Sequence, residues 1–297
     1  MPGRTNKAIE LLEQDQPIYY VGSHSGADLS YEAGKRMAKT YADYINVGME
    51  HGSFDMAGLD QFLLGLVAGG PTNSGHRTPA VIVELPVDGG SEEIIRANAW
   101  QIRQILARGV HGLLLCHAET PGAVKAFVES CRYPFKTIGV GNNLGVGRRG
   151  SGGQGSAAEI WGVSPDEYLD KADPWPLEPN GELLLGLKIE NRRAVENVEL
   201  TTSIPGIAFA EWGQSDMHMS FGYGKARPEP RPPEVQAARD RVFAACKGVG
   251  LRFLEGFTAE TAAEKIDEGN RICGVGGPEG AATAAAGRAY TKRTMPV

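Results

Sequence analysis

The sequence has few cysteines, and their positions do not tie them together. Its 297 residues include four cysteines, and no two of them form a Cys-x-x-Cys pair. They are Cys116, Cys131, Cys246 and Cys273. This spacing favours neither a disulfide scaffold nor a zinc knuckle. A reduced, cytoplasmic protein is the simplest expectation, because disulfides persist mainly in oxidising compartments.

Long hydrophobic runs and an excess of positive charge are also missing. No apolar run reaches the roughly 18 residues that a membrane span needs, and no apolar core follows the charges of residues 1–7, so no signal peptide is expected. The formal net charge is −6, and the lysines and arginines are spread along the chain. Nucleic-acid binding usually needs clustered positive charge. The sequence therefore argues against a membrane or a nucleic acid as partner.

Strand and helix patterns alternate steadily along the chain. Short apolar runs typical of buried strands alternate with segments of helical periodicity. The expected strands are 17–22, 43–48, 79–85, 112–116, 183–189, 206–210, 251–255 and 271–275. The expected helices are 8–14, 27–41, 56–68, 92–108, 121–130, 164–171, 192–198, 234–247, 259–268 and 278–290. Eight strands with helical crossovers predict one (β/α)₈ barrel domain over residues 1–297, with functional residues where strands exit.

A glycine-rich segment, residues 139–155, interrupts this alternation. It contains a GxGxxG-like spacing and two adjacent arginines, Arg148 and Arg149. A dinucleotide-binding motif would follow a strand and open a helix, and this segment does neither. We therefore interpret it as a mobile loop or one that wraps over a site.

Charged residues follow the fifth and sixth expected strands. Lys188 and Glu190 are two residues apart at the end of one strand, so both side chains point to the same face. The next strand leads into Glu211 and then Asp216. Two carboxylates at the exits of neighbouring parallel strands can hold one divalent cation. Alternatively, Glu190 only forms an ion pair with Lys188 or Arg192.

Three histidines, His24, His51 and His117, also follow expected strand exits. A barrel would place all three on one face, where they could take part in chemistry or simply hydrogen-bond to the backbone. Lys188 offers a second chemistry, because a lysine inside a barrel can form a Schiff base with a carbonyl substrate. An ion pair with Glu190 would instead keep it charged and poorly nucleophilic.

Several of these motifs together resemble one enzyme family. They are Glu50-His51, Arg132-Tyr133-Pro134, Lys188-Ile189-Glu190, Gly213-Gln214-Ser215-Asp216 and Gly222. In their order and spacing, from about residue 18 to 290, the chain resembles the HpcH/HpaI aldolase and citrate lyase family. The resemblance implies a (β/α)₈ TIM barrel of the phosphoenolpyruvate/pyruvate-binding type. It also implies an aldehyde-lyase of class II type that cleaves or forms a 4-hydroxy-2-oxo acid through a metal-stabilised enolate.

The resemblance also implies residue roles and partners. Glu190 and Asp216 would ligate Mg²⁺ or Mn²⁺, or alternatively Co²⁺ or Zn²⁺, and His51 would assist proton transfer. The backbone amides from Gly213 through Gln214 and Ser215 to Asp216 would hold the substrate carboxylate. From their positions at the strand exits of the expected barrel, Lys188, His117 and His24 would line the substrate site. The expected partners are a small 2-oxo acid and an aldehyde. A homo-oligomer, trimer or hexamer, is expected, with the helix at 278–290 exchanged between subunits.

Three positions depart from the family pattern. The third strand exit reads Val83-Glu84-Leu85-Pro86, where the family usually has an arginine. Gly48 stands where an aspartate often orients the histidine, and Lys188 stands where glutamine is common. One hypothesis is that Arg148 or Arg149 replaces the missing arginine. The alternatives to the aldolase are a divergent lyase, decarboxylase or acyl-thioester enzyme, a Schiff-base aldolase using Lys188, and a metal-binding barrel without turnover.

Overall fold

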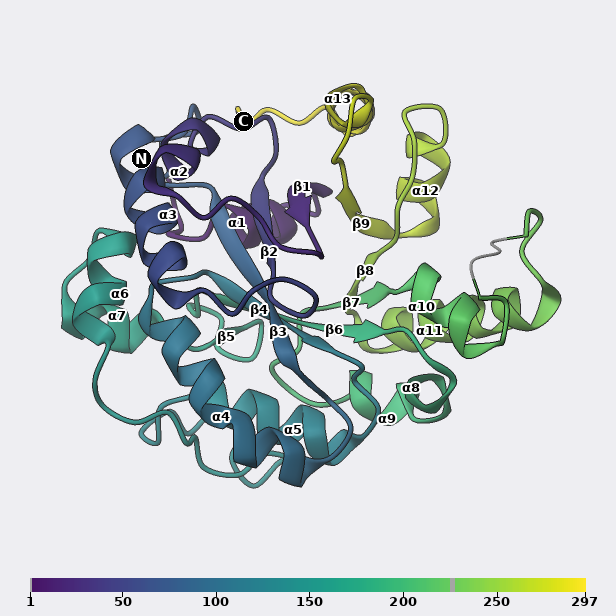
Figure 1. Cartoon of the computed structure of the whole chain (residues 1–297), viewed down its shortest axis with the longest axis horizontal. Helices are drawn as coiled ribbons and strands as arrows, with labels where there is room; N and C mark the ends of the chain where they lie inside the picture. The colour runs from purple at the N-terminus through teal and green to yellow at the C-terminus, as the bar shows by residue number, and fades with distance from the viewer. Residues whose placement is uncertain (1, 225–227) are drawn as a thin grey trace.

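The apolar runs of the sequence form parallel strands that pair in the order in which they follow along the chain. The computed structural model describes residues 2–224 and 228–297, and Figure 1 shows its strands closing into a barrel. The barrel strands are β1 (Ile18–Ser23), β2 (Tyr44–Gly48), β3 (Ala80–Asp88), β4 (Gly112–Cys116), β6 (Leu183–Ile189), β7 (Phe209–Trp212), β8 (Arg252–Leu254) and β9 (Asn270–Gly274). A two-residue strand, β5 (Pro174–Trp175), pairs with the start of β6. Pairing of β1 with β9 and of β4 with β6 completes the predicted (β/α)₈ barrel.

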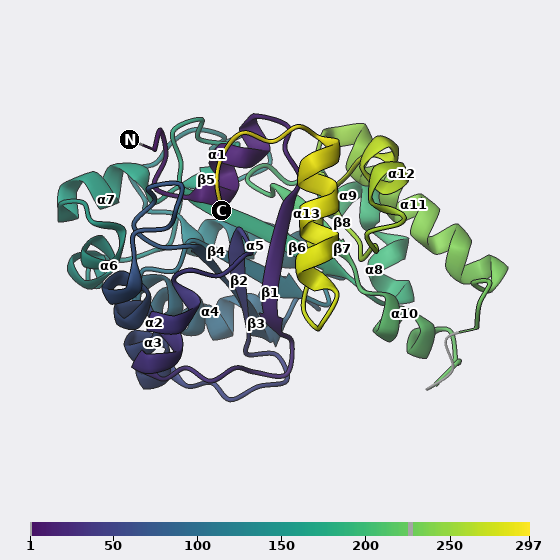
Figure 2. The same cartoon turned by 90° about the horizontal axis from the view of Figure 1, so that it is seen from above.

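Helices cover the outside of this barrel in both views (Figures 1 and 2). They are α1 (Lys7–Glu13), α2 (Tyr31–Met37), α3 (Met56–Gly69), α4 (Glu92–Ala107), α5 (Pro121–Cys131), α6 (Gln154–Trp161), α7 (Pro165–Lys171), α8 (Arg192–Glu196), α9 (Val198–Thr202), α10 (Gln214–Ser220), α11 (Pro233–Val249), α12 (Ala262–Glu268) and α13 (Gly280–Tyr290). Within the described residues, no helix combines the length and apolar character needed to cross a bilayer.

The interior of the barrel changes from apolar to charged along the strands. Ile82, Leu114, Leu184 and Phe209 form a buried cluster together with the apolar face of α1, which closes the N-terminal end of the barrel. On β6, Gly186 leaves room for a neighbour, because a Cβ there would lie 2.2 Å from the Phe209 ring. Side chains alternate along a strand, so the positions after this apolar layer point into the open end of the barrel.

Two segments differ from the expectation. The sixth barrel strand is Phe209–Trp212 rather than 206–210, so Glu211 lies within the strand instead of after it. Gly206 explains the shift, because its φ of 97° is a left-handed turn conformation that cannot continue a strand. The glycine-rich segment also ends in a helix that the sequence pattern missed, α6, which lies between Gly153 and Gly162, both at positive φ.

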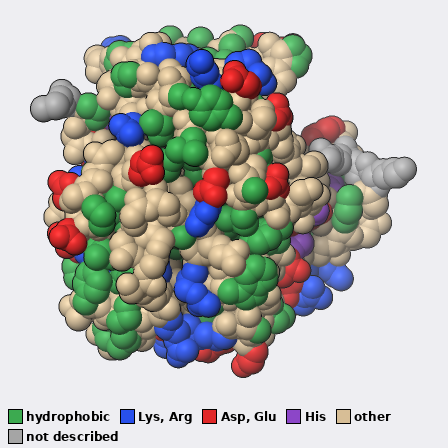
Figure 3. Space-filling model, turned by 60° about the vertical axis from the view of Figure 1, so that its left-hand side comes forward, with side chains coloured by type: hydrophobic (Ala, Val, Ile, Leu, Met, Phe, Trp, Pro, Cys, Tyr) green, Lys and Arg blue, Asp and Glu red, His purple; other side chains and the backbone are tan. Residues whose placement is uncertain are grey.

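The C-terminal helix α13 lies beside β1 on its own chain (Figure 2). Gly287 permits this packing, since a Cβ there would lie 1.8 Å from the Tyr19 hydroxyl. Arg288 donates to the Tyr41 carbonyl at 2.7 Å, and Arg293 forms two hydrogen bonds with the buried Asp43 carboxylate at 2.6 and 2.8 Å. The exchange of this helix between subunits stays a prediction. On the face in Figure 3, acidic and basic side chains are interspersed with apolar ones.

Candidate active site

A cavity lies at the C-terminal ends of the barrel strands, where polar side chains from several elements converge. Its lining residues are His24, His51, Lys188, Glu190, Glu211, Gly213, Gln214, Ser215 and Asp216. They come from the loops after β1 and β2, from β6 and its exit, from β7, and from the start of α10. The barrel therefore brings His24, His51 and the two expected metal ligands, Glu190 and Asp216, to one site.

Lys188 lies at the centre of a group of carboxylates. Its Nζ atom is 2.5 Å from Glu50 Oε2, 3.7 Å from Glu84 Oε2 and 3.8 Å from Glu190 Oε2. Burial by itself would lower the pKa of Lys188, but the surrounding acidic groups outweigh burial and raise the pKa above its ordinary value. The amine therefore stays protonated, which opposes Schiff-base chemistry at this lysine.

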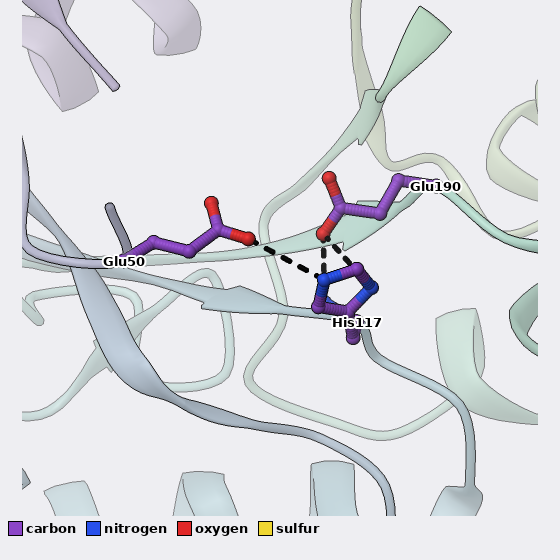
Figure 4. A group of neighbouring side chains, drawn as sticks. All are labelled: Glu50, His117 and Glu190. Carbon is purple, nitrogen blue, oxygen red and sulfur yellow. Dashed lines mark hydrogen bonds and ion pairs between the residues drawn. The ribbon is translucent and has the colours of Figure 1, made fainter. Parts of the chain in front are cut away.

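Glu50, His117 and Glu190 form a compact group beside this lysine (Figure 4). Their ligand atoms lie within 4.8 Å of one another. Glu50 Oε1 is 3.5 Å from His117 Nε2, and Glu190 Oε1 is 3.6 Å from His117 Nδ1. His117 has a φ of 45°, a conformation that is uncommon outside glycine. In this position its backbone N–H donates to Glu190 Oε1 at 2.8 Å.

The donor atoms of this group fit a divalent cation. Glu50 Oε1 and Glu190 Oε2 are buried, and among the described residues neither has a hydrogen-bond partner. Buried carboxylate oxygens normally have one, so both are available to an ion. Two carboxylates and an imidazole are ligands for Mn²⁺, Co²⁺ or Zn²⁺ as well as Mg²⁺. Asp216, in the first turn of α10, lines the same cavity and could complete the site.

The start of α10 packs tightly against Glu190. A Cβ at Gly213 would lie 2.3 Å from Glu190 Cβ, so glycine is required there. The Gly213 amide donates to the Ile189 carbonyl at 3.2 Å. It is therefore not available to bind the substrate carboxylate, contrary to the expectation for the amides from Gly213 to Asp216. The first-turn amides of a helix lack partners within the helix. The N–H groups available to a substrate therefore start at Gln214 and Ser215.

A second polar pair joins His24, which lines the cavity, to Glu84. His24 Nδ1 is 2.5 Å from Glu84 Oε1, and Asn46 Nδ2 donates to the same carboxylate oxygen at 2.8 Å. Glu84 is fully buried in the barrel, whereas the His24 side chain is half-buried. The hydrogen bond that His24 donates to Glu84 raises the pKa of His24, against the opposing effect of burial. In Glu211, burial raises the pKa to about 7.

Residues 80–281, more than half of the chain, match the family model described as HpcH/HpaI aldolase/citrate lyase. The chain belongs to this family. A hydroxypyruvate/pyruvate aldolase of Paraburkholderia phytofirmans is 24% identical over 83% of this chain and 81% of its own length. A 2-keto-3-deoxy-L-rhamnonate aldolase of Klebsiella pneumoniae is 29% identical over 57% of this chain and 58% of its own length. In a hydroxypyruvate/pyruvate aldolase of Sagittula stellata, the match spans about half of either chain, 52% of each, at 29% identity.

Solved structures of the HpcH/HpaI family share the barrel. A family protein from Burkholderia cenocepacia superimposes with a TM-score of 0.69 at 23% identity, covering 96% of this chain and 97% of that chain. Macrophomate synthase gives a TM-score of 0.69 at 21% identity, covering 92% of this chain and 83% of that one. At this level of identity the likeness shows a common fold.

The glycine-rich loop of this HpcH/HpaI protein does not bring its arginines to the cavity. Arg149 is buried against the outer helices, where it donates to the Tyr168 hydroxyl at 2.6 Å and lies over the Tyr133 ring. Arg148 is 61% exposed beside Glu129 of α5. Backbone hydrogen bonds hold both arginines to the C-terminal part of α5. The structure therefore places neither Arg148 nor Arg149 in the cavity lining, and the hypothesis that one of them replaces the missing strand arginine stays a prediction.

The sequence reading gave no role to three acidic residues of the site, Glu50, Glu84 and Glu211. Glu84 and Glu211 each interrupt an apolar run, residues 80–85 in β3 and Phe209–Trp212 in β7. This pattern is itself a signal, because an unpaired charge is rarely buried. The family departures at Glu84 and Lys188 are also linked, because these two side chains lie 3.7 Å apart. One ion pair thus occupies both changed positions.

Proposed function

We propose that this chain is a divalent-metal-dependent lyase that cleaves or forms a carbon–carbon bond in a 4-hydroxy-2-oxo acid. The observation that carries the proposal is the group of Glu50, His117 and Glu190 at the strand exits, of which Glu190 lines the cavity. Among the described residues, two carboxylate oxygens of this group have no hydrogen-bond partner. Family membership supports the reaction class. The relatives named as hydroxypyruvate/pyruvate aldolases support pyruvate, or a close analogue, as one product.

The proposed metal ligands are Glu190 and Asp216, joined by Glu50 or His117. A divalent cation held there would polarise the carbonyl of a 2-oxo acid and stabilise the negative charge that develops on its oxygen. The short contact between Gly213 and Glu190 positions the Glu190 carboxylate against the start of α10. Replacement of that glycine would displace the carboxylate.

The substrate carboxylate would be held at the first turn of α10. Gln214 and Ser215 line the cavity at this turn, and helical N–H groups without a partner favour an anion. Lys188 adds a positive charge to the cavity lining, and the neighbouring acidic groups raise its pKa and so favour the charged form. It balances part of the negative charge of Glu50, Glu84 and Glu190, which would otherwise repel an anionic substrate.

The test is release of pyruvate from 4-hydroxy-2-oxo acids, together with decarboxylation of oxaloacetate. Each assay is run after EDTA treatment and with Mg²⁺, Mn²⁺, Co²⁺ or Zn²⁺ added back. Glu190→Gln should abolish metal-dependent turnover. Asp216→Asn and His117→Asn then identify the remaining ligands, because loss of a ligand raises the metal concentration needed for half-maximal activity. Turnover that survives EDTA and Glu190→Gln would contradict the proposal.

A further inference from the structure

We propose that His24, held by Glu84, is the general acid–base group of this site, and that His51 is not. This inference rests on the proposed lyase function and adds to it the residue that moves the proton. His24 and His51 line the same cavity but have different surroundings.

The His24 ring is held by a carboxylate that is itself fixed. Glu84 on β3 is fully buried, receives a hydrogen bond from Asn46 on β2, and has its second oxygen 3.7 Å from the Lys188 amine. Because Glu84 Oε1 lies 2.5 Å from His24 Nδ1, the proton on the ring occupies Nδ1. The other nitrogen, Nε2, is then the one that can accept a proton in the cavity.

Among the residues that the structure describes, none holds the His51 ring as Glu84 holds that of His24. Its side chain is exposed, and its nearest carboxylate oxygen, Glu50 Oε2, is 3.7 Å away and lies only 2.5 Å from the Lys188 amine. A carboxylate three residues earlier could not help, because position 48 has no space for a side chain. A Cβ on Gly48 would lie 2.3 Å from the His24 backbone oxygen.

The same crowding explains how His24 reaches the cavity. The loops after β1 and β2 are in contact at glycine positions. A Cβ at Gly52 would lie 2.6 Å from the Gly26 Cα, and Gly48 packs against the His24 backbone. Without side chains at these positions the β1 loop packs against the β2 loop. The glycine at position 48 therefore has two effects: it leaves His51 without an orienting carboxylate, and it makes room for the loop that carries His24.

Charged groups around His24 shift its pKa upward. Charged and titratable groups face His24 from four strands: Glu84 on β3, Glu211 on β7, Lys188 on β6, and Tyr20 on β1 at a ring distance of 6.5 Å. The bond to Glu84 and the charge of Glu211 raise the pKa of His24, whereas burial and Lys188 lower it. The net shift of the His24 pKa is upward. The assignment of proton transfer to His24 rests on its position in the cavity and on its hydrogen bond to Glu84.

In the cleavage direction His24 acts first as a base. Nε2 takes the proton from the 4-hydroxyl, the O–H electron pair forms the aldehyde carbonyl, and the C3–C4 bond breaks. The electrons of that bond move to C3 and the 2-oxo carbonyl as an enolate. The imidazolium then returns its proton to C3, giving a 2-oxo acid and neutral His24. The proton taken from the 4-hydroxyl is the one returned to C3, so no other reactant is consumed.

The experiment compares His24→Ala with His51→Ala in pyruvate release at saturating metal. His24→Ala should lower kcat by about 10²–10³-fold with little change in KM, as loss of a general acid–base does. Added imidazole should restore part of that kcat, because the half-buried position leaves a space that it can enter. His51→Ala should lower kcat by less than about tenfold, without rescue. Thermal unfolding curves show that each variant is folded.

Glu84→Gln provides a second readout, since a merely structural role would not change a pH profile. Loss of the Glu84 charge should move the acid limb of log(kcat/KM) to lower pH. Wild-type turnover that is unchanged in His24→Ala but lost in His51→Ala would overturn this inference and leave the proposed function intact. An absence of metal-dependent turnover in the wild type on every substrate tested would overturn both.

Discussion

Lys188→Met tests whether the central lysine holds the carboxylate group together. The substitution keeps most of the side-chain volume but removes the charge that lies within 3.8 Å of Glu50, Glu84 and Glu190. At an effective dielectric constant of 20, each contact near 3.8 Å corresponds to about 4 kcal/mol of attraction, part of which offsets the desolvation of the amine. Removing one partner of a buried ion pair typically costs about 3–5 kcal/mol.

We therefore expect Lys188→Met to lower the free energy of unfolding by about 3–5 kcal/mol at pH 8 in EDTA. The loss should shrink towards pH 5. Without the lysine, the folded-state pKa values of the carboxylates rise above their unfolded values, so the folded state binds more protons as the pH falls and gains stability. A divalent cation should also stabilise this variant more than the wild type, because it replaces the missing positive charge.

The assay is urea unfolding followed by circular dichroism at pH 5 and pH 8, with EDTA or with Mn²⁺. Lys35→Met, on the exposed side of α2, is the matched control and should change stability by less than about 0.5 kcal/mol. If Lys188→Met were as stable as the wild type at pH 8 in EDTA, the lysine would not hold this group together, and the argument from its contacts would fail.

Three further predictions concern other parts of the molecule. Burial lowers the pKa of Lys7 to about 8, below its unfolded value. The free energy of unfolding should therefore rise between pH 8 and 10.5, because the unfolded state binds more protons there. In urea unfolding, Lys7→Met should not show this rise. Gly213→Ala should displace Glu190 and weaken Mn²⁺ binding at least tenfold by isothermal titration calorimetry, with the fold kept. Arg149→Ala should lower the melting temperature and leave KM unchanged, whereas Arg148→Ala should change neither; a raised KM in either would restore a substrate role.

The fold was predictable because each barrel strand is a short apolar run with its own boundaries. The convergence of Lys188 and Glu190 on one face was also predictable, because it depends only on the alternation within one strand. The contacts of Lys188 with Glu50 and Glu84 were not, since they depend on the register between strands that are far apart in sequence. In that register Glu84 pairs with Gly48, and Lys188 pairs with Glu211.

The glycine-rich loop was misplaced for a related reason. Glycine and arginine content indicates neither where a loop lies nor what it covers. Its position follows from the backbone hydrogen bonds to the end of α5 and from the ion pair of Arg132 with Asp173 at 2.8 Å, both of which are tertiary contacts. The sixth strand was set three residues too early because the positive φ of Gly206 could not be known from its neighbours.

The pairing of β1 with β9 has a consequence for synthesis on the ribosome. Ile18 pairs with Ile272, so one edge of β1 has no partner until β9, about 250 residues later, has been made. During that time its free backbone groups can pair with another chain, which is a common route to aggregation. Expression at lower temperature, or with chaperones that bind exposed strands, should therefore increase the yield of folded protein more than any change in the cavity.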